Sequence, residues 1–482
     1  MNLTHPVRQA PRFHVSLGLV IALVLAGCAQ VPQLGPIPTA KPATHYQVAA
    51  SLGRLDGQWP VDAWWKTYGD RQLDGLMEDA LREAPSLAAA QARVDKALAA
   101  AQVSGARLSP SIDATAGVSQ TKQSYNNGVP AAFVPHGWNA SGNVGLNLSW
   151  ELDFWGRNRA ALAAATSTAI AAAADQAQAR LVLTTAIASG YAELARLSAA
   201  RATAEQSLAV RNQTVALFTE RQRNGLETIG SLRQVEARRS LALAELISID
   251  ESIALQKHQL AYLAGAGPDR ALHLAAPTID LRMATGLPST LPADLIGRRP
   301  DVAAARARAE AMAQRIKEAH AAFYPNVNLS AALGFQSLGL DMLAKRDSLA
   351  GNVGPAISLP IFNTARLEGQ YKGARADYAV AVATYDEAVA QALRDVADAA
   401  TSQRMLAERL KHTEAAVAAA GEAWRVVRNR YQGGLATYLE VLNAEDTLLG
   451  NTRELTTLRS RMFALDVQMV RALGGGYTAN QG

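Results

Sequence analysis

Four short segments of the chain alternate between apolar and polar residues. In the clearest of them, apolar side chains occupy every second position from Val144 through Leu146, Leu148 and Trp150 to Leu152. A period of two places the apolar residues of a strand on one face and the polar residues on the other. We therefore predict strands over residues 111–120, 142–153, 326–336 and 352–361.

Each predicted strand has about ten residues, the length that a tilted strand needs to cross a bilayer. A half-buried sheet of a soluble protein would alternate in the same way, so the pattern alone leaves both possibilities open. Four strands cannot close a membrane barrel, because the smallest have eight, and open edges in lipid leave backbone groups unsatisfied. If these strands cross a membrane, several chains must share one barrel, and three chains would supply twelve strands.

Two long segments of the chain predict unusually long helices. Residues 158–223 and 365–432 contain no proline and are rich in Ala, Leu, Arg, Glu and Gln, which favour helices. At 1.5 Å per residue, each would reach about 100 Å. Two shorter helices are expected over 229–264 and 438–473. Helices this long cannot bury themselves in one globular core, so they must pack along one another as a bundle, coiled coil or helical barrel.

The pattern of helices and strands occurs twice along the chain. Pro85 and Pro110 bracket an Ala-rich helical segment, and Pro300 and Pro325 bracket another at a constant spacing of 215 positions (300 − 85 and 325 − 110). A period of this length is too long for a solenoid and indicates a duplicated supersecondary unit. We expect tandem repeats over residues 61–284 and 285–473, followed by a flexible tail over 474–482.

The first 27 residues have the features of an export signal. Arg8 and Arg12 precede an apolar run too short to span a bilayer. The run ends in Leu-Ala-Gly-Cys at Cys28, a lipobox of the kind found in bacterial lipoproteins, and Cys28 is the only cysteine of the chain. An ordinary signal peptide with an incidental cysteine is the alternative. We expect residues 1–27 to be removed, a covalent lipid on Cys28, and an extended proline-rich tether over 28–60.

Charge and composition exclude several functional classes. The formal charge is +5, and basic and acidic residues are interspersed, which argues against a nucleic-acid partner. No apolar segment of helix-spanning length follows the signal, so strands must cross any membrane that the chain spans. The eight histidines lack metal-ligand spacing, and no phosphate-binding glycine loop or nucleophile elbow occurs. We therefore expect no enzymatic activity, no catalytic or metal-binding residues, and no cofactor besides the lipid.

Several motifs, in order along the chain, carry a family resemblance. They are Glu151-Leu-Asp-Phe-Trp-Gly-Arg157, Arg298-Arg299-Pro300-Asp301, Phe323-Tyr-Pro-Asn326 and Tyr431-Gln-Gly-Gly434-Leu435. With the lipobox, they resemble the TolC-like outer-membrane efflux factors, in the lipoprotein (OprM/NodT-like) branch. The resemblance implies an α+β fold in which a trimeric, twelve-stranded transmembrane β-barrel continues into a long periplasmic α-helical barrel.

The resemblance also implies a function and partners. The protein would be a homotrimeric exit duct in the outer membrane, extending into the periplasm, for a tripartite drug efflux pump. It would be a passive conduit gated at its periplasmic end, and it would contact outer-membrane lipid, a periplasmic adaptor and an inner-membrane pump of the resistance-nodulation-division or major-facilitator type. The alternative is a lipid-anchored periplasmic coiled-coil scaffold, which would leave the four alternating segments unexplained.

A Gly-Leu pair follows each long helical segment, at Gly225-Leu226 and Gly434-Leu435. Glycine after a helix accepts the left-handed conformation that reverses the chain. The resemblance implies that these four residues, with Thr437, form the turns that dock to the adaptor. They could alternatively serve only as helix caps.

Polar residues at intervals of three follow the second turn. Glu440, Asn443 and Asp446 would share one helical face. The resemblance implies that Glu440 and Asn443 line the periplasmic entrance, where Glu440 of three chains would form a ring that favours cations. Because Asn443 is not an acid, a second acidic ring is doubtful, and a solvated acidic face is the alternative. Tyr431 and Ser231 also lie at positions that match gate residues of the family.

Overall fold

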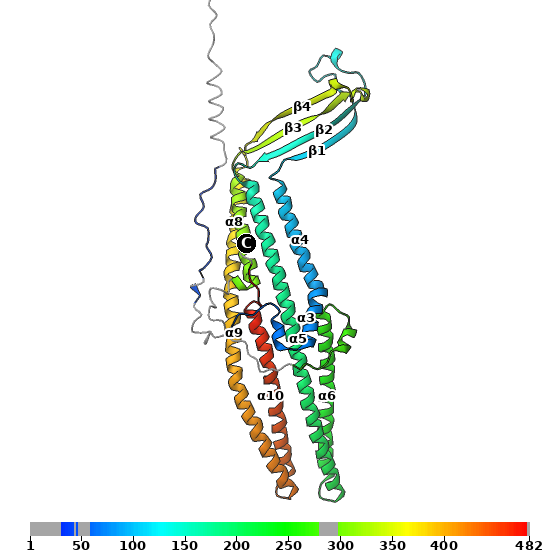
Figure 1. The fold of residues 1–482 in the computed structure, drawn as a ribbon, viewed down its shortest axis with the longest axis vertical. Helices are drawn as coiled ribbons and strands as arrows, with labels where there is room; N and C mark the ends of the chain where they lie inside the picture. The colour runs from blue at the N-terminus through cyan, green and yellow to red at the C-terminus, as the bar shows by residue number, and fades with distance from the viewer. Residues whose placement is uncertain (1–29, 43–44, 47–57, 279–296, 480–482) are drawn as a thin grey trace, which may run out of the picture. The chain divides into compact units, whose positions relative to one another are not determined.

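The computed structural model describes residues 30–42, 45–46, 58–278 and 297–479 (Figure 1). The expected signal peptide, the lipid-attachment residue Cys28, parts of the expected tether and the expected boundary at 284 and 285 lie outside these residues. The chain forms two compact units, and each takes segments from both halves of the sequence. The first contains residues up to Thr39, Asp95–Ile170 and Ala307–Ala383; the second contains Ala40–Val94, Ala171–Arg306 and the residues from Thr384 onward.

The same order of elements occurs in both halves: a helix, two strands, a very long helix and a shorter helix. The four strands, the two long helices and the two shorter helices that follow them begin and end within three residues of the predicted bounds. A further helix, α3 (Arg71–Glu83), precedes the first set. The first set is α4 (Pro85–Ala106), β1 (Ser111–Thr121), β2 (Asn139–Leu152), α5 (Arg157–Arg223) and α6 (Ile229–Leu263); the second is α8 (Pro300–Ala321), β3 (Asn326–Leu338), β4 (Leu349–Ser358), α9 (Thr364–Gln432) and α10 (Tyr438–Ala472).

The four strands of the first unit form one antiparallel sheet in the order β1-β2-β3-β4. Its register sets apolar residues opposite one another, so that Ile112, Leu148, Ala331 and Val353 form one row across the sheet. The predicted alternation therefore produces one apolar face and one largely polar face. The neighbouring row, on the polar face, consists of Asp113, Asn147, Ala332 and Asn352.

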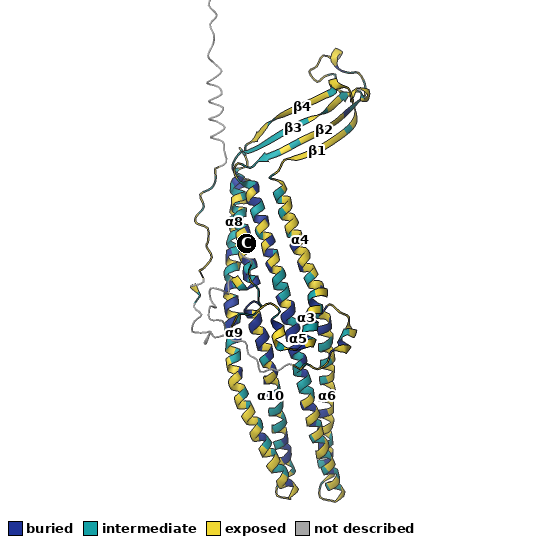
Figure 2. Cartoon of the chain, in the orientation of Figure 1, coloured by how far each residue is buried: buried dark blue, intermediate teal, exposed yellow. Residues whose placement is uncertain are grey.

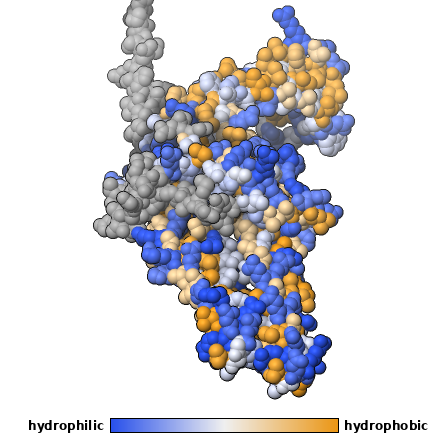
Figure 3. All heavy atoms as spheres, turned by 60° about the horizontal axis from the view of Figure 1, so that its bottom comes forward, coloured by the Kyte–Doolittle hydropathy of each residue, from blue (hydrophilic) through white to orange (hydrophobic). Residues whose placement is uncertain are grey.

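The apolar face of the sheet is exposed in the single chain. Val353 is 76% exposed, Ile112 63% and Leu333 61%. Apolar side chains gather over this part of the molecule in Figure 3. An exposed apolar surface of this kind marks a contact with lipid or with another protein.

A pair of glycines lets two strands approach closely on the polar face. Gly145 of β2 lies opposite Gly334 of β3. A Cβ atom at Gly334 would lie 2.4 Å from the carbonyl oxygen of Val144 and 2.5 Å from the Cα atom of Gly145. Only residues without Cβ atoms permit this approach. The two strands therefore lie unusually close together at this point of the polar face.

The main core of the second unit surrounds α3. Leu73, Leu76 and Met77 of α3 are fully buried against Ile187 of α5 and other apolar residues (Figure 2). Asp70 caps α3 by accepting hydrogen bonds from the N–H groups of Gln72 and Leu73. The Asp70 carboxylate also accepts a hydrogen bond from the buried hydroxyl of Tyr191, 2.8 Å away, which ties the start of α3 to α5.

The Arg-Arg-Pro-Asp motif begins α8 and belongs to a second core of the same unit. Pro300 is the first residue of the helix, where its missing N–H costs nothing, and Asp301 lies in the first turn. Arg299 is buried and forms ion pairs with Asp301 and with Asp395 of α9, the latter at 2.9 Å. The contacts of this motif are those of a structural element that joins α8 to α9.

Candidate functional site at the helix turns

Two turns connect the long helices to the shorter ones, the first turn (residues 224–228) and the second turn (residues 433–437). Gly225 and Gly434 adopt left-handed φ angles of 74° and 76°. In both turns the N–H of the following leucine, Leu226 or Leu435, donates a hydrogen bond of 2.8 Å to a carbonyl five residues earlier. This pattern closes the C-terminus of a helix. The two leucines are 63% and 73% exposed, so each turn presents an apolar side chain to its surroundings.

A threonine caps the helix that follows each turn. Thr228 and Thr437 have φ angles of −86°, and their hydroxyls accept hydrogen bonds from the N–H groups of Ser231 and Glu440, respectively. At the second turn, Glu440 Oε1 also accepts from the Thr437 N–H at 3.1 Å, which completes a capping box. At the first turn, the Ser231 hydroxyl lies 3.0 Å from the Thr228 hydroxyl instead.

The expected entrance residues are both exposed, and one of them has a structural role. The backbone N–H of Thr437, its hydroxyl and the charge of Arg430 lower the pKa of Glu440, so its carboxylate is ionised. That carboxylate folds back onto the cap of its own helix. Asn443 lies one turn further along α10 and is exposed. Their proposed position at a channel entrance stays a prediction.

Asp446, which the sequence placed on the same acidic face, belongs to a cluster of four charged residues. Arg211 Nη2 lies 2.6 Å from Asp446 Oδ1, and Arg238 Nη1 lies 2.7 Å from Asp446 Oδ2. Arg211 Nη1 lies 2.7 Å from Glu445 Oε1, a contact at ion-pair distance whose atoms are not aligned as a hydrogen bond. The hydroxyl of Thr214 donates to the other oxygen of Glu445 at 3.3 Å.

The cluster is electrically balanced and ties three helices together. It joins Arg211 of α5 and Arg238 of α6 to Glu445 and Asp446 of α10. Burial raises the pKa of Glu445, and the charge of Arg211 opposes this shift. Burial also acts to raise the pKa of Asp446, but its hydrogen bonds and charge contacts with both arginines outweigh burial and lower it.

An aromatic cluster connects the two turns closer to their tips. The ring of Phe218 stacks on Tyr431 at a centroid distance of 6.1 Å and contacts Tyr438 at 4.4 Å. The hydroxyl of Tyr431 donates to Glu227 Oε1 at 2.9 Å, and the guanidinium of Arg221 lies 4.9 Å from the Tyr431 ring centroid. Burial and the neighbouring Glu227 carboxylate raise the pKa of Tyr431, so its hydroxyl stays a proton donor. The first turn and the end of α9 are thereby linked within one chain.

Sequence reasoning identified the turns and Tyr431 but missed the residues that join them. The spacing of the repeat could have predicted part of the cluster. The helices α6 and α10 begin 209 positions apart (438 − 229), and Arg238 and Asp446, which form an ion pair, are separated by nearly the same number of positions, 208. The ion pair between Glu245 and Arg453, at 2.6 Å, has the same spacing of 208 (453 − 245). Equivalent positions of the two helices therefore lie side by side. The residues missed are Arg211, Phe218, Glu227, Arg238 and Glu445.

Metal-binding geometry does not occur in the part of the chain that the structure describes, where no three His, Cys, Asp or Glu side chains come together as ligands. Within those same residues, no helix has the length and apolar content needed to cross a membrane.

Comparison with known proteins identifies the family. A sequence profile described as outer membrane efflux protein matches residues 76–266 and 291–475. The chain belongs to the outer membrane efflux protein family. The expected resemblance to TolC-like factors is thus confirmed, and the protein is an outer-membrane protein. This family is defined by efflux and not by an enzymatic reaction.

Relatives match over nearly their whole length. The multidrug resistance outer membrane protein MdtP of Escherichia coli O6:H1 is 30% identical over 487 residues, which cover 98% of this chain and 98% of the relative. MdtQ of the same organism is 29% identical over 466 residues, covering 95% of this chain and 97% of the relative. These proteins are similar to this efflux protein along both of its halves.

Solved structures share the fold. The outer membrane protein VceC from Vibrio cholerae is 47% identical, with a TM-score of 0.83, over 87% of this chain and 100% of VceC. The outer-membrane channel OprN is 25% identical, with a TM-score of 0.81, over 93% of this chain and 99% of OprN. The efflux protein therefore has the mostly helical fold with a small sheet that these outer-membrane proteins have.

Proposed function

We propose that three copies of this efflux protein form a passive exit duct through the outer membrane, as part of a tripartite drug efflux pump. The sheet carries this proposal. Its apolar face is exposed, its opposite face is largely polar, and the outer edges of β1 and β4 have no partner strand within the described part of the chain. These are the properties of an arc of a barrel, with lipid outside and water inside.

The number of copies follows from the need to close the barrel. Unpaired strand edges are not tolerated in lipid, so an arc of four strands must be completed by other chains. Two copies would give eight strands, the size of barrels whose interior is filled by side chains, whereas three copies give twelve strands and room for a lumen. A duct that exports drugs requires that lumen, which favours the trimer.

The relatives support drugs as the cargo class. MdtP and MdtQ are named multidrug resistance outer membrane proteins. A passive duct accepts what reaches its entrance, so discrimination between drugs belongs to an inner-membrane pump of the resistance-nodulation-division or major-facilitator type. The duct itself performs no enzymatic reaction and needs no cofactor besides a lipid on Cys28.

The helix turns form the periplasmic end in this proposal. The exposed Leu226 and Leu435 provide apolar side chains for a periplasmic adaptor, supported by Gly225, Gly434 and Thr437, which shape the turns. Glu440 of each copy lines the entrance with Asn443, and the bond from Tyr431 to Glu227 joins the two turns of one copy. Opening requires the turns to separate from those of the next copy.

Two adjacent residues of β4 test the barrel. Val353 lies on the apolar face and Asn352 on the polar face. A lysine facing lipid near the middle of the bilayer costs about 2–4 kcal/mol, whereas a lysine facing the lumen is tolerated. We expect Val353→Lys to abolish the heat-modifiable oligomer in outer-membrane fractions. Asn352→Lys should preserve the oligomer and lower its cation selectivity in planar bilayers.

Equal tolerance of both lysines, or a monomer without conductance, would refute the duct. A lipid-anchored scaffold would also leave the loop between β1 and β2, residues 126–135, inaccessible to reagents that label intact cells from outside. Labelling of that loop is the expected result for the duct.

Docking is tested by cysteine crosslinking to the adaptor. Cysteines in place of Leu226 and Leu435 should form products, and a cysteine in place of Leu241, an equally exposed leucine within α6, should not. The absence of a product at both turns would exclude them as the docking site.

A further inference from the structure

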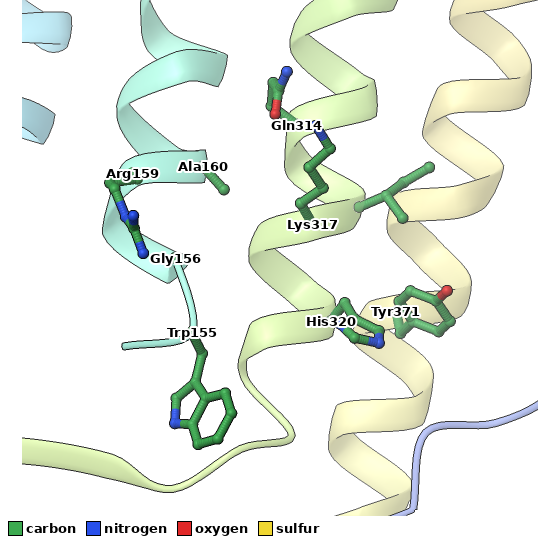
Figure 4. A pocket seen from close by; sticks show the side chains of 9 residues that line it. Trp155, Gly156, Arg159, Ala160, Gln314, Lys317, His320 and Tyr371 are labelled. Carbon is green, nitrogen blue, oxygen red and sulfur yellow. The ribbon is translucent and has the colours of Figure 1, made fainter. Parts of the chain in front are cut away.

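A cavity of about 600 Å³ lies beside the sheet in the first unit (Figure 4). It opens between the start of α5 and the end of α8, and α9 contributes one side chain. Arg159 of α5 and Lys317 of α8 lie on opposite sides of it in Figure 4. The lining residues are Trp155, Gly156, Arg159, Ala160, Gln314, Ile316, Lys317, His320 and Tyr371.

The cavity is basic, and its arginine is held in place. Lys317 is exposed, and no carboxylate of the described residues forms an ion pair with it. Asp153 accepts from the backbone N–H of Asn158 and Arg159, and it also contacts Arg159 Nε at 3.3 Å. Arg159 Nη2 donates to the Asp153 carbonyl at 2.9 Å. The residues that line the cavity therefore include Arg159 and Lys317 but no carboxylate, and the contact of Arg159 with Asp153 leaves Lys317 as an unneutralised charge for an anion.

The cavity lies at the end of the apolar strands. Trp155 follows β2 by three residues, and its indole N–H donates to the carbonyl of Pro325, the residue before β3, at 2.8 Å. Its ring stacks on Tyr324 at a centroid distance of 4.7 Å. Phe154 is 64% exposed beside it. Exposed Trp, Tyr and Phe side chains at the end of membrane-spanning strands occupy the level of lipid headgroups.

The described N-terminal residues reach the same place. Val31 packs against Phe323 and Leu367 in a cluster that includes Tyr371, one of the cavity's lining residues. The guanidinium of Arg375, one turn further along α9, donates to the Gly35 carbonyl. Val31 is three residues from Cys28, and three residues span at most about 10 Å. A lipid on Cys28 would thus enter the membrane close to this cavity.

We propose that the cavity binds the phosphodiester headgroup of an anionic phospholipid. Phosphate oxygens accept charge-assisted hydrogen bonds from Lys317 and Arg159, and the ring of Trp155 lies against the glycerol and upper acyl region. Phosphatidylglycerol suits this cavity because its headgroup carries only negative charge. Phosphatidylcholine is zwitterionic and would bring its choline cation toward Arg159 and Lys317. The inference rests on the proposed membrane insertion of the sheet and assigns to it a particular headgroup site.

Native mass spectrometry of the purified protein in mild detergent tests the site with two lipids and one soluble phosphate. The probes are dioleoyl-phosphatidylglycerol, dioleoyl-phosphatidylcholine and glycerol 3-phosphate. We expect Lys317→Gln to weaken phosphatidylglycerol binding by about tenfold, the loss of one charge-assisted hydrogen bond, and to leave phosphatidylcholine binding unchanged. Lys317→Arg should retain binding. Arg159→Gln should weaken it as well, although its contact with Asp153 also supports the start of α5.

Lys372→Gln is the matched control. Lys372 is adjacent to Tyr371 on α9 but pairs with Glu368 at 3.0 Å and does not line the cavity, so its loss should not change lipid binding. Equal binding of the two lipids, or unchanged phosphatidylglycerol binding in Lys317→Gln, overturns the proposal. Glycerol 3-phosphate that binds as tightly as the lipid overturns the lipid assignment.

Conductance separates this inference from the proposed duct. In bilayers of neutral lipid, the wild type and Lys317→Gln should conduct alike. A wild type that does not conduct in any lipid refutes the duct, whereas normal conductance without a preference for phosphatidylglycerol refutes only the headgroup site.

Discussion

The first and second turns share a backbone but differ in chemistry. Both have a left-handed glycine, an exposed leucine and a threonine cap with the same φ angle. After the first turn the cap is completed by the hydroxyl of Ser231, and after the second by the carboxylate of Glu440. The conformation of a turn is set by its glycine and cap, so the other side chains are free to diverge.

The ionic cluster joins the two hairpins through residues of opposite charge. The α5–α6 hairpin supplies Arg211 and Arg238 to the ionic cluster, and α10 supplies Glu445 and Asp446. Two elements with the same backbone therefore attract each other within one chain. The comparison teaches that repetition of the backbone sets the geometry of the helices, while differences in side chains decide how the hairpins are held together.

The substitution of Glu445 should weaken the contact between α10 and the α5–α6 hairpin more than any other change considered below. Glu445→Ala leaves Arg211 buried with only its contact to Asp446. Loss of one partner of a buried ion pair costs about 3 kcal/mol. We expect roughly a hundredfold faster hydrogen exchange in the first three turns of α10, because local opening becomes easier by that free energy.

Glu454→Ala serves as the control for that change, because Glu454 lies on the same helix and pairs with Arg409 across an exposed surface. Such pairs contribute about 0–1 kcal/mol. If both variants exchange equally, the buried cluster does not hold the hairpins together.

The two glycines test whether the turn backbones are equivalent. A Cβ atom at Gly225 or Gly434 would meet no neighbour within 4 Å, so alanine adds only backbone strain. The left-handed conformation costs about 1–2 kcal/mol for a residue with a side chain. We expect Gly225→Ala and Gly434→Ala to lower the thermal unfolding temperature by similar amounts. A clear difference would show that the turns are not interchangeable.

The variant Asp446→Asn distinguishes the contribution of Asp446 to stability from that of Glu445, because the two contributions depend differently on pH. The folded pKa of Asp446 is lowered from its ordinary value of 3.8, so its contribution is present above that value and is lost as pH falls through the folded pKa. The pKa of Glu445 shifts the other way, because its burial raises it and outweighs the charge of Arg211. Because Asp446 is 47% exposed, we expect a contribution of about 1 kcal/mol at neutral pH.

The measurement is the difference in unfolding temperature between the wild type and Asp446→Asn from pH 7 to pH 3. The difference should be largest at pH 7 and should shrink in acid. A difference that is constant across this range would contradict an ionised Asp446 as its source.

Glu440→Gln should have the smallest effect on stability and the most specific effect on transport. Glutamine keeps the shape and the hydrogen-bond acceptor of the capping box but removes the charge. We expect a small decrease in the unfolding temperature, because the lowered pKa of Glu440 means that its ionised carboxylate favours the fold, and weaker cation block of the reconstituted channel. If cation block is unchanged while Glu440→Ala lowers stability, Glu440 is a cap and not part of a charged ring.

Elements that depend on local pattern could be predicted from the sequence. A period of two gave the strands, and the absence of proline gave α5 and α9, because these signals act over neighbouring residues. The ionic cluster could not be predicted in this way, since Arg211 and Asp446 are 235 residues apart (446 − 211) and meet only through helix packing. Its position depends on which faces of α5, α6 and α10 pack together.

At Glu440 the prediction and the structure differ for another reason. The capping box was visible in the sequence, because Thr437 and Glu440 have the spacing of Thr-x-x-Glu before a helix. The polar residues after the second turn, Glu440, Asn443 and Asp446, instead suggested one helical face by their spacing of three. In the structure they separate into a cap at Glu440, an exposed amide at Asn443 and an ion pair at Asp446.

The close approach of Gly145 and Gly334 has a consequence for how the sheet tolerates mutation. A Cβ atom at Gly334 would overlap the backbone of β2, so a methyl group there must push the two strands apart, whereas a Cβ atom at Gly145 would lie 3.2 Å from the carbonyl oxygen of Leu333. Two glycines that face each other across the junction of the repeats are thus unequally replaceable.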